Sequence, residues 1–215
     1  MRKFFYLLLL TLVWSSADAQ SLPPVWLGST DVQYSTRTIA YLPPTRIVWQ
    51  ETSGSSSIEG IDKLLLPGNG QAELVGGKEC VIRKRPDGKV SFLLDFGREL
   101  QGGIQIVTGQ SSRKEAKVRI RFGESVSEAM CDITPENGAT NDHAIRDFHF
   151  TLPWLGVAEI GNSGFRFVRI DVEEPDIDLL LKEVRATFGY RDIPYLGSFK
   201  SDNNRLNDIW MTGAY

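Results

Sequence analysis

The polar residues best suited to chemistry gather between Asp132 and Asp147, around the run Asn137-Gly138-Ala139-Thr140-Asn141-Asp142-His143. Carboxylate and amide oxygens of this kind are the ligands that Ca²⁺ prefers in proteins. An Asx-rich turn, whose side chains bond the local backbone, explains the same composition. The spacing is not that of an EF-hand, so the sequence leaves both interpretations open. The candidate calcium ligands are Asp132, Glu136, Asn141 and Asp142.

His143 beside Asp142 has the residue types of a catalytic base and its orienting carboxylate. Adjacent residues seldom face each other, however, and no Ser or Cys lies in a Gly-x-Ser-x-Gly nucleophile elbow, so a catalytic triad is not predicted. Asp95 and Glu124 both lie at the ends of predicted strands and could form the carboxylate pair of a glycosidase. The sequence favours a simpler role for Asp95, as a turn acceptor or the buried partner of an arginine.

Aromatic side chains suggest a second kind of site, a stacking platform for a sugar ring. Trp154 is the best-placed candidate, because Leu152-Pro153-Trp154-Leu155-Gly156 forms a loop between two predicted strands. With the neighbouring polar stretch, it predicts a carbohydrate site at Trp154, Asp142 and His143. A tryptophan that packs a loop onto the core or onto a neighbouring domain would show the same pattern, and the sequence favours that role.

The elements that must position these residues are β-strands. Val118, Ile120 and Phe122 alternate with Arg119 and Arg121, which is the period-two pattern of a strand with one wet face. Similar runs, separated by Gly-, Pro- and Ser-bearing turns, predict an all-β fold, an antiparallel β-sandwich or jelly roll. We expect Gly97, Gly102 and Gly103 at strand ends and a hairpin across Pro86-Asp87-Gly88. The predicted strands are 45–51, 80–84, 90–96, 102–107, 118–124, 148–152, 165–172 and 179–190.

The pattern changes after Tyr195. Ser201 and Asp202 can cap a helix in which Leu206, Ile209, Trp210 and Gly213 share one face. A helix of about a dozen residues is marginal in isolation, so its apolar stripe needs a partner. We therefore expect 45–196 to be a β-sandwich domain. We expect 197–215 to be a linker and the first helix of a second, helical domain that is cut short at Tyr215.

The N-terminus has the features of an export signal. Arg2 and Lys3 precede the apolar run 4–14, and Ala17-Asp18-Ala19 follows as a cleavage site. We expect residues 1–19 to be a signal peptide, 20–44 an extended lead segment, and the mature chain to be periplasmic or extracellular. No other segment has the length and hydropathy of a membrane span.

Composition excludes some classes of function. The chain has 215 residues and a net charge of −3, with 24 basic and 27 acidic residues interspersed. A nucleic-acid-binding protein would show a clustered basic face, so this class is not predicted. Two cysteines, Cys80 and Cys131, do not make a disulfide scaffold in a chain of this length, and we expect free thiols.

Four segments resemble the N-terminal part of bacterial α-L-rhamnosidases of glycoside hydrolase family 78. In that family a β-sandwich region precedes an (α/α)6 barrel, and the acid and base of an inverting mechanism lie on the barrel. The resemblance therefore implies that the catalytic residues lie outside this chain, and none is assigned here. Some sandwich domains of the family bind rhamnose through calcium. The four segments are Phe92–Gly103, Arg121–Ser125, Gly164–Ile170 and Phe199–Tyr215.

These observations predict the accessory β-sandwich of a secreted inverting α-L-rhamnosidase, which removes terminal α-L-rhamnose from glycans or glycosides. The chain would act as scaffold and partner of its own barrel, inactive alone and without a cofactor other than calcium. One alternative is a carbohydrate-binding module for rhamnose-containing glycans. A secreted, purely structural adhesin-like domain is a further alternative.

Overall fold

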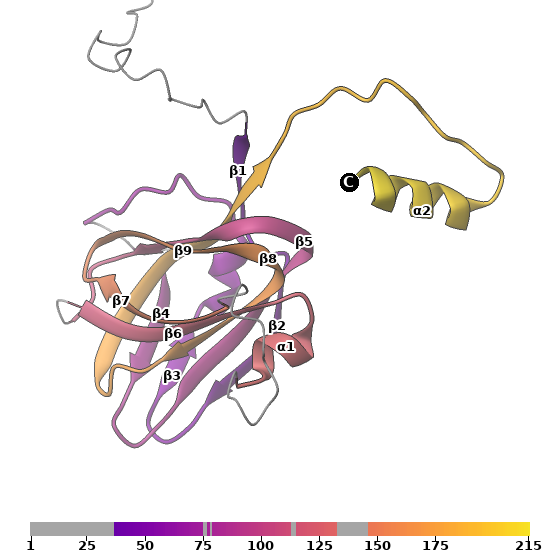
Figure 1. Cartoon of the computed structure of the whole chain (residues 1–215). Helices are drawn as coiled ribbons and strands as arrows, with labels where there is room; N and C mark the ends of the chain where they lie inside the picture. The colour runs from indigo at the N-terminus through magenta and orange to yellow at the C-terminus, as the bar shows by residue number, and fades with distance from the viewer. Residues whose placement is uncertain (1–36, 75–76, 78, 113–114, 133–145) are drawn as a thin grey trace, which may run out of the picture. The chain divides into compact units, whose positions relative to one another are not determined.

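A computed structural model describes residues 37–74, 77, 79–112, 115–132 and 146–215. Within these ranges the chain is an all-β sandwich, as predicted, with nine antiparallel strands and three short helices (Figure 1). The strands are β1 (Thr38–Leu42), β2 (Arg46–Thr52), β3 (Ser57–Glu59), β4 (Cys80–Lys84), β5 (Val90–Thr108), β6 (Glu115–Gly123), β7 (Asp147–Pro153), β8 (Gly156–Val172) and β9 (Ile177–Tyr190). The helices are the 3-10 helix η2 (Ile61–Leu65), α1 (Val126–Met130) and α2 (Asn204–Ala214).

Two long strands, β5 and β8, run through both layers of the sandwich. The first half of β5 pairs with β2 and with the second half of β8, whereas its second half pairs with β9 and with the first half of β8. One layer therefore has the order β2-β5-β8-β6-β7, and we call it the β6 layer. The other, the β9 layer, contains β1, β3, β4 and β9 with the remaining halves of β5 and β8.

Glycines allow the long strands to bend between the layers. The register of β5 on β8 shifts between Asp95 and Leu100, where Gly97 has a φ of 85°. Gly161 in β8 also has a φ of 85°, and a Cβ there would lie 2.6 Å from the Phe122 ring. Such bulges are favourable where a strand must turn a corner. The predictions of separate strands at 90–96 and 102–107, and of a turn at 161–164, were wrong.

The predicted hairpin of 80–84 with 90–96 was also wrong. β4 pairs with β3 and β9, while the first half of β5 pairs with β2. Pro86-Asp87-Gly88 does make a turn, but this turn carries the chain from the β9 layer into the β6 layer. Turn-forming residues therefore predicted the change of direction, and they could not predict the hydrogen-bonded partner of either strand.

The core lies between the two layers and is built from the alternate residues of each strand. Phe92 and Leu94 face inward from one half of β5, and Ile104 and Ile106 from the other. Phe165 packs edge-on against Phe122, with 5.0 Å between ring centroids. Each of these side chains is almost fully excluded from solvent, so the apolar alternation seen in the sequence accounts for the stability of the sandwich.

β1 lies within the stretch 20–44 and pairs with the end of β9. At the other end of the described chain, α2 begins after Asn203, whose side chain accepts a hydrogen bond from the Arg205 N–H. No residue of α2 is buried, although Tyr195 and Phe199 lie near the Trp210 ring. In the part of the chain that the structure describes, no helix has the length and apolar character to cross a bilayer.

Candidate functional site

The outer face of the β6 layer carries two rows of mostly polar residues that the strand register lines up. Directly paired residues of neighbouring strands lie on the same face of a sheet. Because their sequence neighbours fill the core, the members of both rows point away from it. The first row is Glu51, Ser91, Asp171, Arg119 and His149. The second is Trp49, Leu93, Arg169, Arg121 and Asp147.

Asp171 is the centre of the charged network on this face. It accepts hydrogen bonds from Ser91 Oγ at 2.6 Å, Arg169 Nε at 2.9 Å and Arg121 Nη2 at 2.7 Å. Burial alone would raise its pKa, but the bonds from Ser91, Arg169 and Arg121 outweigh burial and lower it. Arg121 is only 4% exposed. A buried guanidinium needs such a partner, and Asp171 provides it for Arg121.

Arg119 and Arg121 both bind the carboxylate of Asp132. Their Nη1 atoms lie 3.0 Å and 2.9 Å from Asp132 Oδ1. Arg119 also donates to Asp147 through Nε at 2.8 Å. These two arginines therefore lie side by side with a fixed orientation, and their aspartate partners come from different segments of the chain.

Helix α1 covers the apolar end of the same face. Its Ala129 packs with Leu93 and Phe167, and Trp49 and Met130 lie beside them. The guanidinium of Arg169 lies 5.1 Å from the centroid of the Trp49 ring. This cation–π contact and the bonds to Asp171 leave Arg169 little freedom. Helix α1 was not predicted, although Ser125 and Glu128 have the spacing of a capping box, and the Ser125 side chain accepts from the Glu128 N–H.

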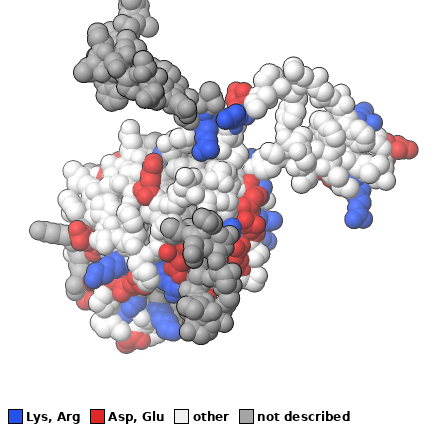
Figure 2. Space-filling view, in the orientation of Figure 1, with Lys and Arg blue, Asp and Glu red and all other residues white. Residues whose placement is uncertain are grey.

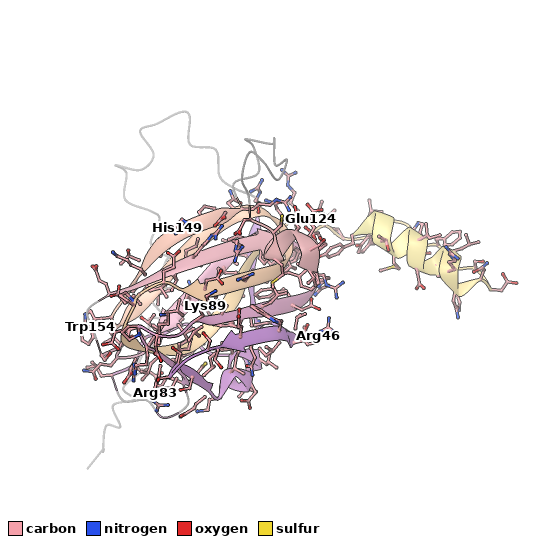
Figure 3. The ribbon with its side chains drawn as sticks, turned by 90° about the horizontal axis from the view of Figure 1, so that it is seen from below. Arg46, Arg83, Lys89, Glu124, His149 and Trp154 are labelled. Atoms are coloured by element: carbon pink, nitrogen blue, oxygen red, sulfur yellow. The ribbon has the colours of Figure 1, made fainter. Side chains whose placement is uncertain are left out.

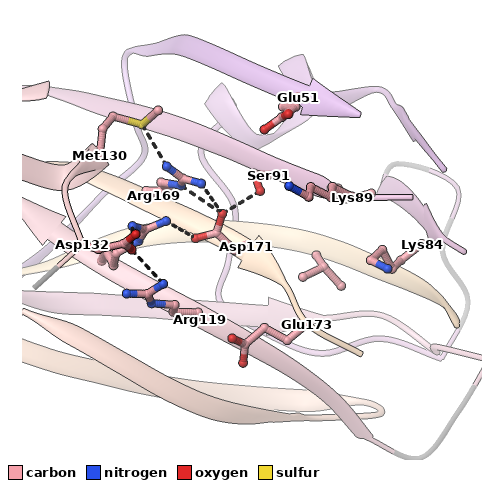
Figure 4. Close-up of a pocket in the computed structure, with 13 residues that line it drawn as sticks. Glu51, Lys84, Lys89, Ser91, Arg119, Met130, Asp132, Arg169, Asp171 and Glu173 are labelled. Carbon is pink, nitrogen blue, oxygen red and sulfur yellow. Dashed lines mark hydrogen bonds and ion pairs between the residues drawn. The ribbon is translucent and has the colours of Figure 1, made fainter. Parts of the chain in front are cut away.

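Members of both rows line a pocket of about 310 Å³ (Figure 4). Five of its lining residues are cationic and four are anionic, and no aromatic side chain lines it within the described part of the chain. Figure 4 shows the hydrogen bonds that join Ser91 and Arg169 to Asp171, and the ion pair of Arg119 with Asp132. The cationic residues are Lys84, Lys89, Arg119, Arg121 and Arg169, and the anionic ones are Glu51, Asp132, Asp171 and Glu173.

Two lysines of the pocket differ from its arginines because they have no carboxylate partner among the described residues. Lys84 is 8% exposed, since it lies on the core side of β4 in line with Cys80 and Ile82. Its Nζ donates to the Arg85 carbonyl at 2.9 Å. Lys89 is exposed at the start of β5. Both ammonium groups have donors left over for a ligand.

The residues proposed for calcium and sugar binding are only partly within the described chain. Asp132 is described, and its carboxylate is bound by two arginines. Glu136, Asn141, Asp142 and His143 lie outside the described residues, so the predictions at these positions stay predictions. Among the residues that are described, no group of three His, Cys, Asp or Glu is arranged to hold a metal ion.

Trp154 lies in the turn between β7 and β8 and is 41% exposed. Its carbonyl accepts a hydrogen bond from the Ser111 N–H at 3.0 Å. Figure 3 places Trp154 at the opposite end of the sandwich from Arg46 and Glu124. Trp154 does not line the 310 Å³ pocket, so the predicted stacking platform and the charged pocket are separate features.

Asp95 and Glu124 do not form a carboxylate pair suited to catalysis. Asp95 accepts bonds from Arg166, Arg46 and the Gly97 N–H. Burial would raise the pKa of Asp95, but these bonds lower it to about 2, so the carboxylate is held charged as the partner of arginines. Glu124 in turn binds Arg146 at 2.9 Å.

A second cavity, of about 610 Å³, lies where the ends of β9 and α2 approach the bend of β5. The Tyr215 hydroxyl donates to the Glu99 carbonyl at 2.7 Å, and its ring stacks on Phe188. Tyr190 and Tyr195 also line this cavity, which is therefore rich in aromatic surface. Burial and the nearby charge of Glu124 raise the pKa of Glu99.

Sequence reasoning missed the charged pocket as a site. The alternation Arg119–Arg121 was recognised as a wet strand face, and Arg169 and Asp171 have the same spacing. These two alternating pairs were the available signal. Only the register of β6 on β8 brings them together, and no local pattern specifies that register.

No protein-family model matches this sequence, and no curated protein matches it. Solved structures do. A rhamnosidase from Klebsiella oxytoca with rhamnose bound is 13% identical to this chain, with a TM-score of 0.51. The match covers 80% of this chain and 33% of the rhamnosidase chain. A family GH78 rhamnosidase of Bacillus sp. GL1 is 18% identical with a TM-score of 0.50, covering 70% and 14%.

A fucose-binding module of Streptococcus pneumoniae is also similar, at 11% identity and a TM-score of 0.43, covering 69% of this chain and 96% of the module. The chain spans a third or less of the two rhamnosidase chains that it matches. At these identities the similarity to the rhamnosidases establishes a shared fold. The resemblance in sequence to these enzymes is thus matched by a resemblance in structure.

Proposed function

We propose that this chain is the accessory β-sandwich part of a secreted, inverting α-L-rhamnosidase that removes terminal α-L-rhamnose from glycans or glycosides. In this role the sandwich supports a helical catalytic domain and has no hydrolytic activity alone. The fold shared with two rhamnosidases and the four sequence segments support the proposal. N-terminal sequencing of the exported protein tests the secretion step, with Gln20 expected as the first residue.

The observation that carries the proposal is the apolar surface of residues 193–215. This stretch contains eight of the fifteen exposed large hydrophobic residues of the described chain. In Figure 2 most of this surface is uncharged, whereas both signs of charge are interspersed over the sandwich. An exposed apolar patch of this kind marks a protein interface. The eight residues are Ile193, Tyr195, Leu196, Phe199, Leu206, Ile209, Met211 and Tyr215.

A partner domain would also explain why α2 is a helix. The helix has 11 residues and buries none of them. So short a helix is marginal in water unless one face packs against something. Leu206, Ile209 and Trp210 provide such a face, and the helices of a catalytic barrel would cover it.

The states of Asp95 and Asp171 are consistent with a catalytic site elsewhere. An inverting glycosidase holds a free acid and a free base about 6.5–9.5 Å apart with a water between them. Asp95 and Asp171 are each bound by two arginines and have lowered pKa values. Neither is available as an acid or a base.

The test compares the purified 215-residue chain with the product of the complete gene on an aryl α-L-rhamnoside. We expect turnover by the complete protein, with the inverted anomer as the first product by NMR, and none by the chain. Turnover by the chain alone would refute the proposal. A complete protein that is inactive on rhamnosides but active on another glycoside would refute the substrate assignment.

A variant pair tests the interface in the complete protein. Ile209→Asp places a charge on the apolar face of α2, and Met211→Asp makes the same change about 200° around the helix. We expect Ile209→Asp to lower the melting temperature and the activity more than Met211→Asp does. Equal effects of both variants would contradict packing through the face of Leu206, Ile209 and Trp210.

A binding role is the second candidate, and the pocket on the β6 layer favours it. A carbohydrate-binding module of this fold would bind sugar without any catalytic domain. Titration calorimetry with L-rhamnose, with and without calcium, tests this role. Absence of heat at millimolar sugar removes it.

A further inference from the structure

We propose that the 310 Å³ pocket, which is lined by the outer face of the β6 layer and by Lys84 of β4, binds an acidic sugar, with a uronate carboxylate held by Lys84 and Lys89. The choice of a sugar as the carrier of the carboxylate rests on the proposed role in glycan breakdown. The preference for an anion does not, because it follows from the two lysines of the pocket and above all from the burial of Lys84.

The pairing of charges in the pocket sets its two lysines apart from its three arginines. The three arginines are bound by aspartates, with Asp171 shared by Arg121 and Arg169. Glu173, which contacts His149 at 2.9 Å, and Glu51 also line the pocket, and both are exposed to water. Lys84 and Lys89 are therefore the two cationic groups of the pocket that no carboxylate in the described chain binds.

The burial of Lys84 strengthens this point. A lysine is seldom buried without a carboxylate partner, because removing an ammonium group from water is costly. Only 8% of the Lys84 surface is exposed, and its Nζ donates to a single backbone carbonyl, that of Arg85. An anionic group in the pocket would satisfy the remaining donors and offset the cost of burial.

The shape and lining of the pocket indicate a small polar ligand. Its 310 Å³ is near the lower end of the range for ligand sites, which is about 300–1,000 Å³. Within the described residues no aromatic ring lines it, and the nearby Trp49 ring is covered by Arg169. Neutral sugars are commonly held by stacking on such rings, so this pocket is better suited to recognition by charge and hydrogen bonds.

The arginine–aspartate rows give the pocket a rigid wall. Ser91 Oγ is fixed by Asp171 at 2.6 Å, and Asp171 is fixed by two guanidinium groups. Sugar hydroxyls can donate to or accept from such groups, and a site that is already ordered loses little entropy on binding. We therefore assign the lysines to the carboxylate and this wall to the ring hydroxyls.

The experiment is isothermal titration of the 215-residue chain with methyl D-glucuronoside and methyl D-glucoside. The two ligands differ only by a carboxylate in place of a hydroxymethyl group. We expect the glucuronoside to bind at least about tenfold more tightly, because charge-assisted hydrogen bonds are the stronger kind. We also expect its affinity to fall as salt is raised, because part of the site is open to water.

Matched variants locate the site. Lys84→Met and Lys89→Met keep the aliphatic stem and remove the charge, and each should weaken glucuronoside binding at least about fivefold. Lys200→Met makes the same change in net charge on an exposed lysine outside the pocket and should leave binding unchanged. Because Lys84→Met alters a buried position, Lys89→Met at an exposed position provides the test that does not depend on folding.

Three results would overturn the inference. The first is equal binding of the glucoside and the glucuronoside. The second is binding of acetate or sulfate as tightly as the glucuronoside, which would mean an unspecific anion site. The third is absence of binding, or unchanged binding by the two pocket variants. None of these bears on whether the complete protein hydrolyses rhamnosides, so the two proposals fail separately.

Discussion

Asp95 holds the bend of β5 in place and so contributes to the stability of the sandwich. Its replacement by Asn should lower the free energy of unfolding by a measurable amount. The carboxylate is 2% exposed and binds Arg46 Nη2 at 2.7 Å, Arg166 Nε at 2.8 Å and the Gly97 N–H at 2.7 Å. Asn is nearly isosteric, so it keeps the volume. It carries no charge for the arginines and offers one acceptor oxygen instead of two.

The magnitude follows from the pKa of Asp95. Burial raises this pKa, but the hydrogen bonds from Arg166, Gly97 and Arg46 lower it from 3.8 to about 2. At about 1.36 kcal/mol for each pKa unit, the difference corresponds to about 2.5 kcal/mol. Both arginines are partly open to water, and screening reduces the expected loss to about 1–2 kcal/mol at neutral pH.

The sign of the pH dependence is fixed by the same values. Because the pKa of Asp95 is lowered in the folded state, its contribution to the free energy of unfolding is fully present above the unfolded pKa of about 3.9. This contribution is lost as pH falls towards 2. Urea unfolding followed by tryptophan fluorescence should therefore show a lower free energy of unfolding for Asp95→Asn than for the wild type at pH 7. The gap should narrow between pH 4 and pH 2.

The control is Asp192→Asn, which removes one negative charge from an exposed position. It should change the free energy of unfolding by less than about 0.5 kcal/mol. A gap for Asp95→Asn that does not change with pH would refute the electrostatic explanation. No gap at all would refute the assignment of Asp95 as the partner of the arginines.

Three further predictions concern other positions. Gly161→Ala should cost about 2 kcal/mol or more in unfolding free energy, because φ is 85° and the new Cβ would lie 2.6 Å from the Phe122 ring; a neutral effect would contradict the bend. Cys131 is exposed and Cys80 is 0% exposed with its pKa raised by burial to about 12. A thiol reagent should therefore label one cysteine in the native chain and two in denaturant, and native labelling of both would contradict the fold. Burial and a neighbouring carboxylate raise the pKa of Glu99, so the folded state holds its proton more tightly and stability falls as pH rises through that pKa. Glu99→Gln should weaken this decline in urea unfolding at pH 4–8, and a steeper decline would contradict the sign.

Much of the fold could be predicted because it depends on local patterns. The alternation in 118–124 and the long strand predicted at 179–190 correspond to β6 and β9. A strand with one face in the core must alternate, whatever its partner. The all-β class and the sandwich were therefore accessible without a structure, and so was the C-terminal helix, whose stripe has helical spacing.

The pairing of strands could not be predicted because it depends on distant contacts. Val90 starts a strand directly after a strong turn, yet its partner is Thr52 in β2. Glycine has two uses in strands, at their ends and at bends within them, and sequence alone does not separate these. Gly97 and Gly161 belong to the second kind, which is why β5 and β8 were divided into shorter strands.

The candidate site was hidden for the same reason. An arginine that alternates with core residues is expected to be solvated, and the sequence of β6 alone supports that expectation. Asp171 changes the outcome, because its register beside Arg119 on one side and Ser91 on the other converts separate polar faces into one bonded network. The chemistry of this face is therefore a property of the pairing rather than of any motif.

The strand β5 connects the two surfaces to which we assign functions. Ser91, near its start, lines the charged pocket, and the Glu99 carbonyl, at its bend, accepts the hydrogen bond from Tyr215. Between them Asp95 fixes the bend through its arginines. A substitution at Asp95 should therefore disturb both uronate binding and the packing of the C-terminal segment, whereas Lys89→Met should affect binding alone. Because a strand transmits a change of bend along its length but not a lost surface charge, this difference separates structural coupling from independent sites on one scaffold.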